Sequence, residues 1–275
     1  MEGKYKDISQ IHITRGKRSA DTPLQRDHFH RYYELFYLVS GKCRFLLKDS
    51  IYNLEKGNFV FISPGELHHS LYFPGTVCDV SFLYFKEDFF MTTVPGFHLP
   101  PLRQKSFMGT VPSLFHVDFQ TLLNRLLSEQ GQIDEHSPSF MLCYLNELLL
   151  FLMRHSVLSE EDPELINAKE ADILIATKYI YQNFQKPLTL ENVAAVSALS
   201  PTYFSKKFKA TTGMGFKQYL NFIRLKHSAA ALLTTNRSIT DIALEYGFND
   251  SNYFKDLFKK EYGCSPREFR KRQQD

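Results

Sequence analysis

The chain has 275 residues, of which 43% are hydrophobic and 23% are charged. These ordinary fractions exclude wholesale disorder and collagen-like structure, and the length suits one large domain or two of ordinary size. Four cysteines without a CxxC pair argue against a disulfide scaffold and a cysteine zinc site. The N-terminus has no apolar signal-peptide core, and the most apolar stretch, residues 141–153, is too short to span a bilayer. We therefore expect a cytoplasmic protein without a membrane partner.

The charge is divided unevenly along the chain. Residues 168–275 carry 17 Lys and Arg against 10 Asp and Glu, a net charge of +7, whereas the whole chain has a net charge of only +3. A basic segment attached to a mildly acidic remainder indicates a module that binds a polyanion. The alternative is a basic surface that is merely well solvated.

Residues 28–95 have the pattern of an all-β domain. Apolar runs rich in aromatic and β-branched residues occupy 34–39, 43–47 and 58–62, and turn residues interrupt them at 40–42, 48–50 and 63–65. Short strands with regular turn signals predict a β-sandwich or a small barrel.

The periodicity then becomes helical. Apolar residues at helical spacing predict helices over 114–127 and 140–158, separated by Gly131 and Pro138. The second helix is apolar enough to pack on two sides, either against the barrel and a partner subunit or within one chain. The acidic, proline-ended segment 159–163 lacks periodicity. We therefore predict domains at 1–158 and 168–275, joined by a linker at 159–167.

The strongest signal in the C-terminal part is an internal repeat. The segment 203–213, YFSKKFKATTG, recurs 50 residues later as YFKDLFKKEYG at 253–263. Upstream, the pattern Leu190-xx-Val193-Ala194 recurs as Ile239-xx-Ile242-Ala243 with an offset of 49 residues. Two tandem copies of one supersecondary unit are predicted.

Each copy is predicted to form a helix, a short turn and a second helix. Ser200 before Pro201 favours a helix start in the first copy, Asp250 serves as the cap in the second, and Gly213 is placed to end a helix. A small alanine in the first helix lets the two helices cross closely, as in a helix-turn-helix unit. A generic helical hairpin is the alternative.

The second helix of each copy has one aromatic face and one polar face. Phe204 and Phe208 are four residues apart and are expected to point inward. The outward residues can then reach base edges and phosphates in a major groove. These candidate DNA-binding residues are Thr202, Ser205, Lys206 and Lys209 in the first copy, and Ser251, Asn252, Lys255 and Lys259 in the second. Asn252 can pair bidentately with adenine, whereas Asp256 either accepts from a cytosine amino group or is simply solvated.

The motif residues of the second copy resemble a known family. The segment 238–270, which contains SITDIA, GFNDSNYF and GCSPREFR, is similar to the signature of AraC/XylS-type bacterial transcription regulators. The resemblance covers about 105 residues and implies two helix-turn-helix units joined by a long helix at 216–233, with both recognition helices in successive major grooves. Residues 213–216, Gly-Met-Gly-Phe, depart from the Gly-x-Ser-Pro of many members, which weakens one helix cap.

The N-terminal part carries a second resemblance. His28, His30 and Glu34, followed by Gly41, match the first cupin motif HxHxxxE-x6-G, and the segment from Gly57 to His68 resembles the second motif. In metal-binding cupins His28, His30, Glu34 and His68 would be ligands for Mn, Fe, Ni or Zn. In sensor domains of AraC-type regulators such positions line an effector pocket or form internal hydrogen bonds. These three roles remain open here, and no metal or cofactor is assigned.

Together these features predict an α+β two-domain protein, with an N-terminal cupin-like β-barrel or jelly roll plus helices and a C-terminal all-α domain with two helix-turn-helix units. The predicted function is a sequence-specific transcription regulator that responds to a small-molecule effector and has no catalytic residues. One alternative is a metal-dependent cupin enzyme with a helical DNA-binding appendage, and another is a DNA-binding protein whose β-domain only dimerises. The expected partners are double-stranded promoter DNA, the effector and a second copy of the chain, with RNA polymerase as a further candidate.

Overall fold

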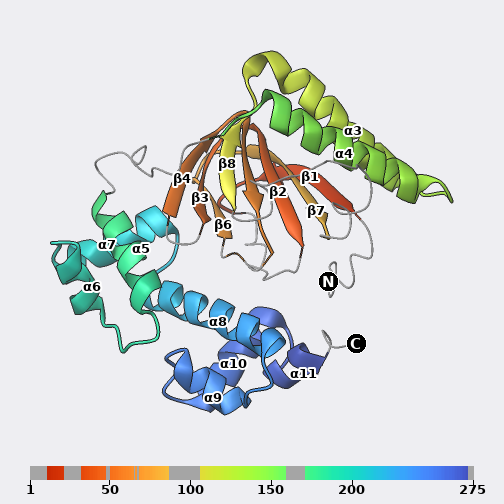
Figure 1. The fold of residues 1–275 in the computed structure, drawn as a ribbon. Coiled ribbons are helices and arrows are strands. Elements are labelled where there is room, and N and C mark those ends of the chain that lie inside the picture. The colour runs from red at the N-terminus through yellow and green to blue at the C-terminus, as the bar shows by residue number, and fades with distance from the viewer. Residues whose placement is uncertain are drawn as a thin grey trace.

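The computed structural model describes residues 11–21, 32–47, 50–64, 66, 68–86, 106–158 and 171–271 (Figure 1). Its strands are β1 His12–Arg18, β2 Tyr33–Ser40, β3 Lys42–Leu47, β4 Ser50–Glu55, β5 Asn58–Ile62, β6 His68–Tyr72, β7 Cys78–Phe85, β8 Phe107–Thr110 and β9 Val157–Leu158. They form a larger sheet in the order β1-β7-β2-β5-β8-β9 and a smaller one in the order β4-β3-β6. All strand pairs are antiparallel.

Side-chain alternation on the central strand β2 creates two separate cores. Tyr33, Leu35 and Tyr37 point to one face of the larger sheet, and Phe36 and Leu38 point to the other. The second group meets the inner face of the smaller sheet, so the cluster around Phe36 is the interior of the barrel. The predicted cupin-like barrel is confirmed.

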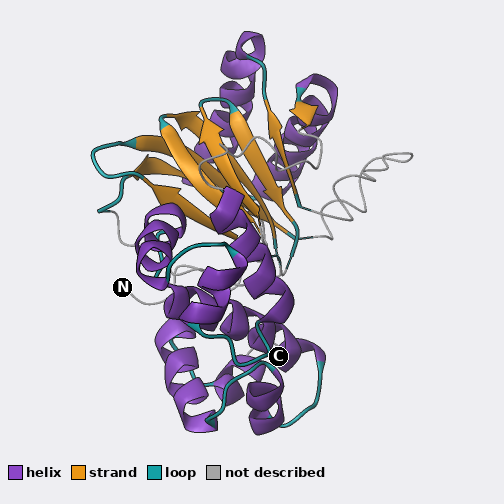
Figure 2. Cartoon of the chain, turned by 90° about the vertical axis from the view of Figure 1, so that its left-hand side faces the viewer, coloured by secondary structure: helices purple, strands orange, loops and turns teal. Residues whose placement is uncertain are grey.

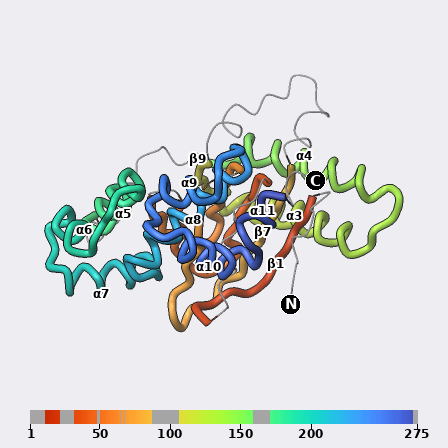
Figure 3. Tube along the Cα trace, turned by 90° about the horizontal axis from the view of Figure 1, so that it is seen from below, coloured from red at the N-terminus to blue at the C-terminus, as the bar shows by residue number. Residues whose placement is uncertain are grey.

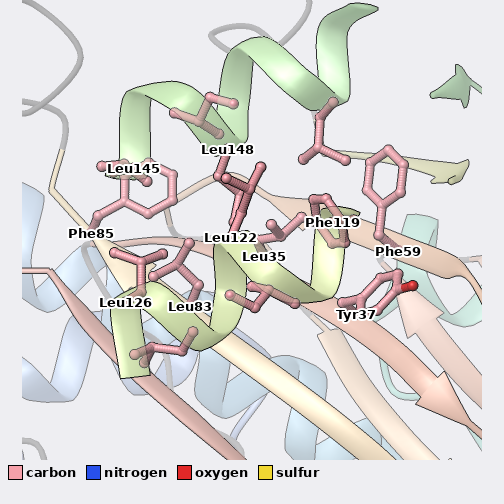
Figure 4. Close-up of a cluster of buried hydrophobic side chains, with 14 of the residues drawn as sticks. Leu35, Tyr37, Phe59, Leu83, Phe85, Phe119, Leu122, Leu126, Leu145 and Leu148 are labelled. Atoms are coloured by element: carbon pink, nitrogen blue, oxygen red, sulfur yellow. The ribbon is translucent and has the colours of Figure 1, made fainter. Parts of the chain in front are cut away.

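Two helices cover the outer face of the larger sheet (Figures 1 and 2). They are α3, His116–Gly131, and α4, Ser137–His155, which follow the short 3₁₀ helix η1, Ser113–Phe115. Leu122 and Leu126 of α3 and Leu145 and Leu148 of α4 pack on the buried side chains of the sheet, as Figure 4 shows.

In the part of the chain that the structure describes, α4 buries one face against the sheet. Its opposite side exposes Phe140, Leu150 and Met153, which favours the interpretation of a free second side over a helix sandwiched inside one chain. Leu114 and Val117, which fit the predicted apolar stripe, are also exposed. They lie at the junction of η1 and α3, before Phe119, the first residue of α3 that is buried against the sheet. The helix ends at His155, and the next two residues, counted in the predicted helix, form the edge strand β9.

The C-terminal part is helical and contains both predicted units. Its elements are α5 Ala171–Asn183, α6 Leu190–Val196, α7 Pro201–Thr212, α8 Phe216–Thr234, α9 Ile239–Glu245, α10 Ser251–Tyr262 and α11 Pro266–Lys271. Helices α6 and α7 form the first helix-turn-helix unit, and α9 and α10 form the second. Figure 3 shows the two units at either end of α8, which matches the predicted connecting helix.

The caps explain why both copies fold alike. Thr189 and Ser238 begin α6 and α9, and each accepts a hydrogen bond from a backbone N–H three residues on. Gly213 and Gly263 end α7 and α10 in the left-handed conformation. Ser200 starts α7 with extended backbone geometry but makes no side-chain capping bond, so the predicted cap is wrong in this respect, and Pro201 at the first turn favours the helix start.

The smaller sheet lies between the barrel interior and the helical domain. Leu46 of β3 and Ile51 of β4 point outward and share a buried cluster with side chains of α5, α7 and α8. The successive layers are therefore α3 and α4, the larger sheet, the smaller sheet and the helical domain. The predicted linker at 159–167 lies outside the described residues. Within the described ranges no helix is long and apolar enough to cross a membrane.

Candidate nucleic-acid interface and effector site

The recognition helix of the first unit, α7, is held by its aromatic face. Phe204 and Phe208 are fully buried, and their ring centroids lie 5.1 Å apart. Thr202, Lys206 and Lys209 are exposed and Ser205 is half-buried. The structure thus places Thr202, Lys206 and Lys209 on the exposed side of α7 and Ser205 at the edge of that side.

The second recognition helix, α10, repeats this arrangement. Phe254 and Phe258 are fully buried, with ring centroids 5.5 Å apart. Asp250 caps the helix by accepting a hydrogen bond from the Asn252 N–H at 2.7 Å. The solvent-facing candidates of this helix are Ser251, Asn252, Lys255, Asp256 and Lys259, of which Ser251 alone is half-buried. Equivalent positions of the two recognition helices are therefore polar and exposed or half-buried.

The central helix α8 fixes the two units relative to each other. Arg224 donates from Nε to the Phe184 carbonyl and from Nη2 to the Lys186 carbonyl, both at 2.7 Å. Burial lowers the pKa of Arg224. Asn221 donates to the hydroxyl of Tyr253 on α10 at 2.9 Å. These contacts link the loop before the first unit with the second recognition helix, and the sequence patterns did not reveal them.

The candidate effector site lies in the barrel interior. Nε2 of His68 on β6 is 3.1 Å from Oε2 of Glu34 on β2, and Nδ1 of His68 lies 2.9 Å from the Glu66 carbonyl. The His68 ring stacks on Phe45 with a centroid distance of 6.0 Å. Glu34 is only 2% exposed. Two residues from different cupin-like motifs therefore meet at one place.

The surroundings of His68 act on its protonation in opposite directions. Burial lowers the pKa of His68, whereas the Glu34 carboxylate and the hydrogen bonds to Glu34 and Glu66 raise it, and the net shift is upward from 6.5. The Lys226 ammonium on α8 opposes this rise. Because the pKa of His68 depends on the Glu34 carboxylate, a ligand that interacts with either side chain changes the protonation of the imidazole.

The other two cupin-like candidates, His28 and His30, lie outside the described residues. Among the residues that are described, no group of three or more His, Cys, Asp or Glu side chains is placed to hold a metal ion.

Residues next to this site were missed by sequence reasoning. Lys226 is buried, and its ammonium lies 5.3 Å from the ring centroids of both Phe222 and Tyr262. His69 points away from His68, as the strand alternation predicts, and its ring centroid is 6.5 Å from that of Phe222. The site therefore borders α8, and no local pattern could have paired residues of β6 and α8, which lie some 150 positions apart in the chain.

The fold and these sites define a ligand-sensing barrel attached to two helix-turn-helix units. Residues 11–149 match the model of the AraC-like ligand binding domain, and residues 193–272 match a model described as a helix-turn-helix domain. The chain therefore belongs to the AraC family of transcription regulators. The resemblance seen in the repeat is confirmed, and so is the expectation that the chain is a regulator and not an enzyme.

Similar proteins cover nearly the whole chain. The HTH-type transcriptional activator RhaS of Enterobacter sp. (strain 638) is 29% identical over 250 residues, which are 89% of this chain and 87% of that protein. The HTH-type transcriptional activator RhaR of Yersinia pseudotuberculosis is 25% identical over 248 residues, which are 90% of this chain and 84% of that protein. The structure of ToxT from Vibrio cholerae with bound unsaturated fatty acid is 16% identical, covers 96% of each chain and has a TM-score of 0.41.

Proposed function

We propose that this chain activates transcription by placing α7 and α10 in adjacent major grooves of promoter DNA, under the control of a small effector bound in the barrel. The observation that carries the proposal is the matched exposure of the two recognition helices. Each helix buries its phenylalanine pair and leaves the equivalent polar positions open. Because a single helix joins the two units, both recognition helices can contact bases on the same face of a duplex.

Within this function the exposed side chains have distinct roles. The lysines, Lys206, Lys209, Lys255 and Lys259, contact phosphates and supply affinity that depends on salt. The shorter polar residues, Thr202, Ser205, Ser251 and Asn252, lie nearer the helix starts and read base edges.

The effector is a small polar metabolite. Glu34 and His68 supply an acceptor and an imidazole inside a barrel that is otherwise lined with aromatic and aliphatic side chains. A few polar groups among apolar side chains are typical of ligand sites, in which the polar groups orient the ligand. His28 and His30 belong to the same proposed pocket by their place in the first cupin-like motif.

We assign residues 1–158 to the sensor domain, 159–167 to a linker and 168–275 to the DNA-binding domain. The exposed side of α4, with Phe140, Leu150 and Met153, supports a homodimer through the sensor domain. RNA polymerase is the partner through which an activator bound to a promoter acts. Because promoter DNA is the target, the protein works in the cytoplasm.

The test uses the full-length protein. Duplexes that it binds are selected from a random pool, and their affinity is measured across a series of salt concentrations. We expect a steep loss of affinity with salt and a footprint on two groove segments about 10 base pairs apart. Weak binding that does not change with salt, or a footprint on a single segment, would contradict the proposal. Metal analysis of the same preparation tests the alternative role of the barrel residues as metal ligands.

A further inference from the structure

Cys43 of β3 and Cys78 of β7 meet inside the barrel. The strand β3 belongs to the smaller sheet and β7 to the larger one, and both thiols are buried in the same apolar cluster as Phe36. A hydrogen bond joins the two thiol groups, with Cys43 as the donor. Cys78 in turn donates to the Lys42 carbonyl, with Sγ and O 3.2 Å apart. Two sulfur atoms from different sheets are therefore in contact, although 35 positions separate them in the chain.

This thiol pair lies at the end of the barrel that is away from Glu34 and His68. On β3, Cys43 pairs with Tyr72 near the start of the strand, whereas Leu47 pairs with His68 at the other end. The two thiols are therefore separate from the candidate effector site, and they lie on neither of the recognition helices.

The turn between β2 and β3 covers the Cys78 sulfur. Gly41 in this turn is half-buried, and its neighbours Ser40 and Lys42 are exposed. A Cβ at Gly41 would lie 2.7 Å from Sγ of Cys78, so a residue without a side chain is required above the sulfur. The positive φ of Gly41, 95°, also favours glycine. A small oxidant therefore needs only a local opening of this exposed turn to reach Cys78.

The hydrogen bond makes the two thiols chemically unequal. It lowers the pKa of Cys78 from 9.0 to about 7, although burial alone would raise this pKa. The same hydrogen bond, together with burial, raises the pKa of Cys43. Because the thiolate is the reactive form of cysteine, Cys78 is the sulfur that reacts first. Cys43 is then the neighbouring thiol that completes a disulfide.

We propose that Cys43 and Cys78 are a redox-sensitive pair, which closes to a disulfide between the two sheets when the protein is exposed to a hydroperoxide. The Cys78 thiolate attacks one oxygen of hydrogen peroxide, so that an S–O bond forms, the O–O bond breaks, and the departing hydroxide takes up a proton and leaves as water. The Cys43 sulfur then attacks the sulfenic acid. The S–S bond forms, the S–O bond breaks, and hydroxide leaves as water with the proton from Cys43.

The overall reaction is balanced and reversible. Two thiols lose two electrons and two protons, and one peroxide is reduced to two molecules of water. A dithiol reductant then restores both thiols by exchange through a mixed disulfide. In a reducing compartment the bond is transient, which is typical of cysteines that sense oxidants and not of a structural disulfide.

The test treats the reduced, full-length protein with hydrogen peroxide and maps its disulfides by mass spectrometry of peptides that have not been reduced. We expect a bond between Cys43 and Cys78, which dithiothreitol reverses. Because the bridge closes a long loop and so restricts the unfolded chain, the sensor domain should melt about 5–10 °C higher after oxidation. Hydrogen exchange should also become slower in β3 and β7.

Single cysteine variants provide the controls. Cys43→Ala and Cys78→Ala should each lose the disulfide and the rise in melting temperature. Cys143→Ala should keep both, because Cys143 is exposed on α4, outside the barrel. Oxidation of Cys78 to a sulfinic acid without a bond to Cys43 would overturn the proposed pair. A wild-type peptide map in which Cys143 is oxidised and both barrel thiols stay reduced would also overturn it, whether or not the variants fold.

Discussion

Glu34 and His68 meet inside the barrel at 3.1 Å, although 34 positions separate them in the chain. Glu34 shares the inward face of β2 with Phe36 and Leu38, and His68 begins β6 on the facing sheet. The pair thus joins the two sheets at the end of the barrel that borders α8. Because Glu34 raises the pKa of His68, a measured change in this pKa reports a change at the pair.

The pKa of His68 should lie above 6.5 in the folded protein and should fall in Glu34→Gln, because the neutral amide no longer favours the imidazolium. The pair contributes its full stabilisation below about pH 6.5, the pKa of histidine in the unfolded chain. This stabilisation is lost as the pH rises through the higher pKa of His68 in the folded protein. NMR titration of the ¹³C-labelled histidines in the two proteins measures both values. Identical values would show that Glu34 does not act on His68.

Loss of the Glu34 carboxylate should remove the effector response and leave basal DNA binding intact. The residue lies in the barrel and not on α7 or α10, so Glu34→Gln changes the pocket without changing the DNA-facing residues. A thermal-shift screen of metabolites identifies the effector first, since a ligand of the native state raises the melting temperature. A well-folded Glu34→Gln protein with an unchanged shift would make Glu34 a purely structural residue.

Lys206→Ala should weaken DNA binding by about 1 kcal/mol if the ammonium contacts a phosphate, and by up to about 3 kcal/mol if it pairs with guanine. Lys206 is exposed on α7 beside the buried Phe204 and Phe208, so the fold should be unaffected. Affinity measured over several salt concentrations separates the two cases, because a lost phosphate contact also lowers the salt slope. Lys56→Ala, an exposed change on the sensor domain, is the control and should bind as the wild type does.

Asn252→Ala should relax the preference for one base pair in the operator, at a cost of about 1–3 kcal/mol. The side chain is exposed in the first turn of α10, where recognition helices contact base edges. Its effect should vanish on duplexes that carry another base at that position. Equal losses on every sequence would place Asn252 on the phosphate backbone instead.

Asp250→Ala should destabilise the second unit by about 1 kcal/mol, because the Asn252 N–H loses its capping acceptor. Asp256→Ala on the same helix removes an equal charge from an exposed position in the helix interior and serves as the control. Hydrogen exchange of the α10 amides measures the difference between the two variants. Similar exchange in both would mean that the cap contributes nothing measurable.

The sequence by itself determined the local structure of this protein. The repeat, the cap at Asp250 and the paired phenylalanines indicate two helix-turn-helix units, since capping and helical periodicity depend on residues only a few positions apart. The predicted cap at Ser200 forms no side-chain hydrogen bond, and the caps at Thr189 and Ser238 were seen only in the structure. The alternation along β2 likewise placed Glu34 on an inward face. These signals also carried the resemblance to the AraC family, which the comparisons confirmed.

Only the tertiary structure decided what these elements touch. Arg44 reaches the end of α7 across more than 160 positions, and Lys226 stands beside His68 although nothing in their local sequences links them. The exposed side of α4 and the exposure of Leu114 likewise depend on which face meets the sheet. Contacts of this kind arise from the packing of whole layers against one another, so the same local pattern is compatible with many partners until the sheets and helices are assembled.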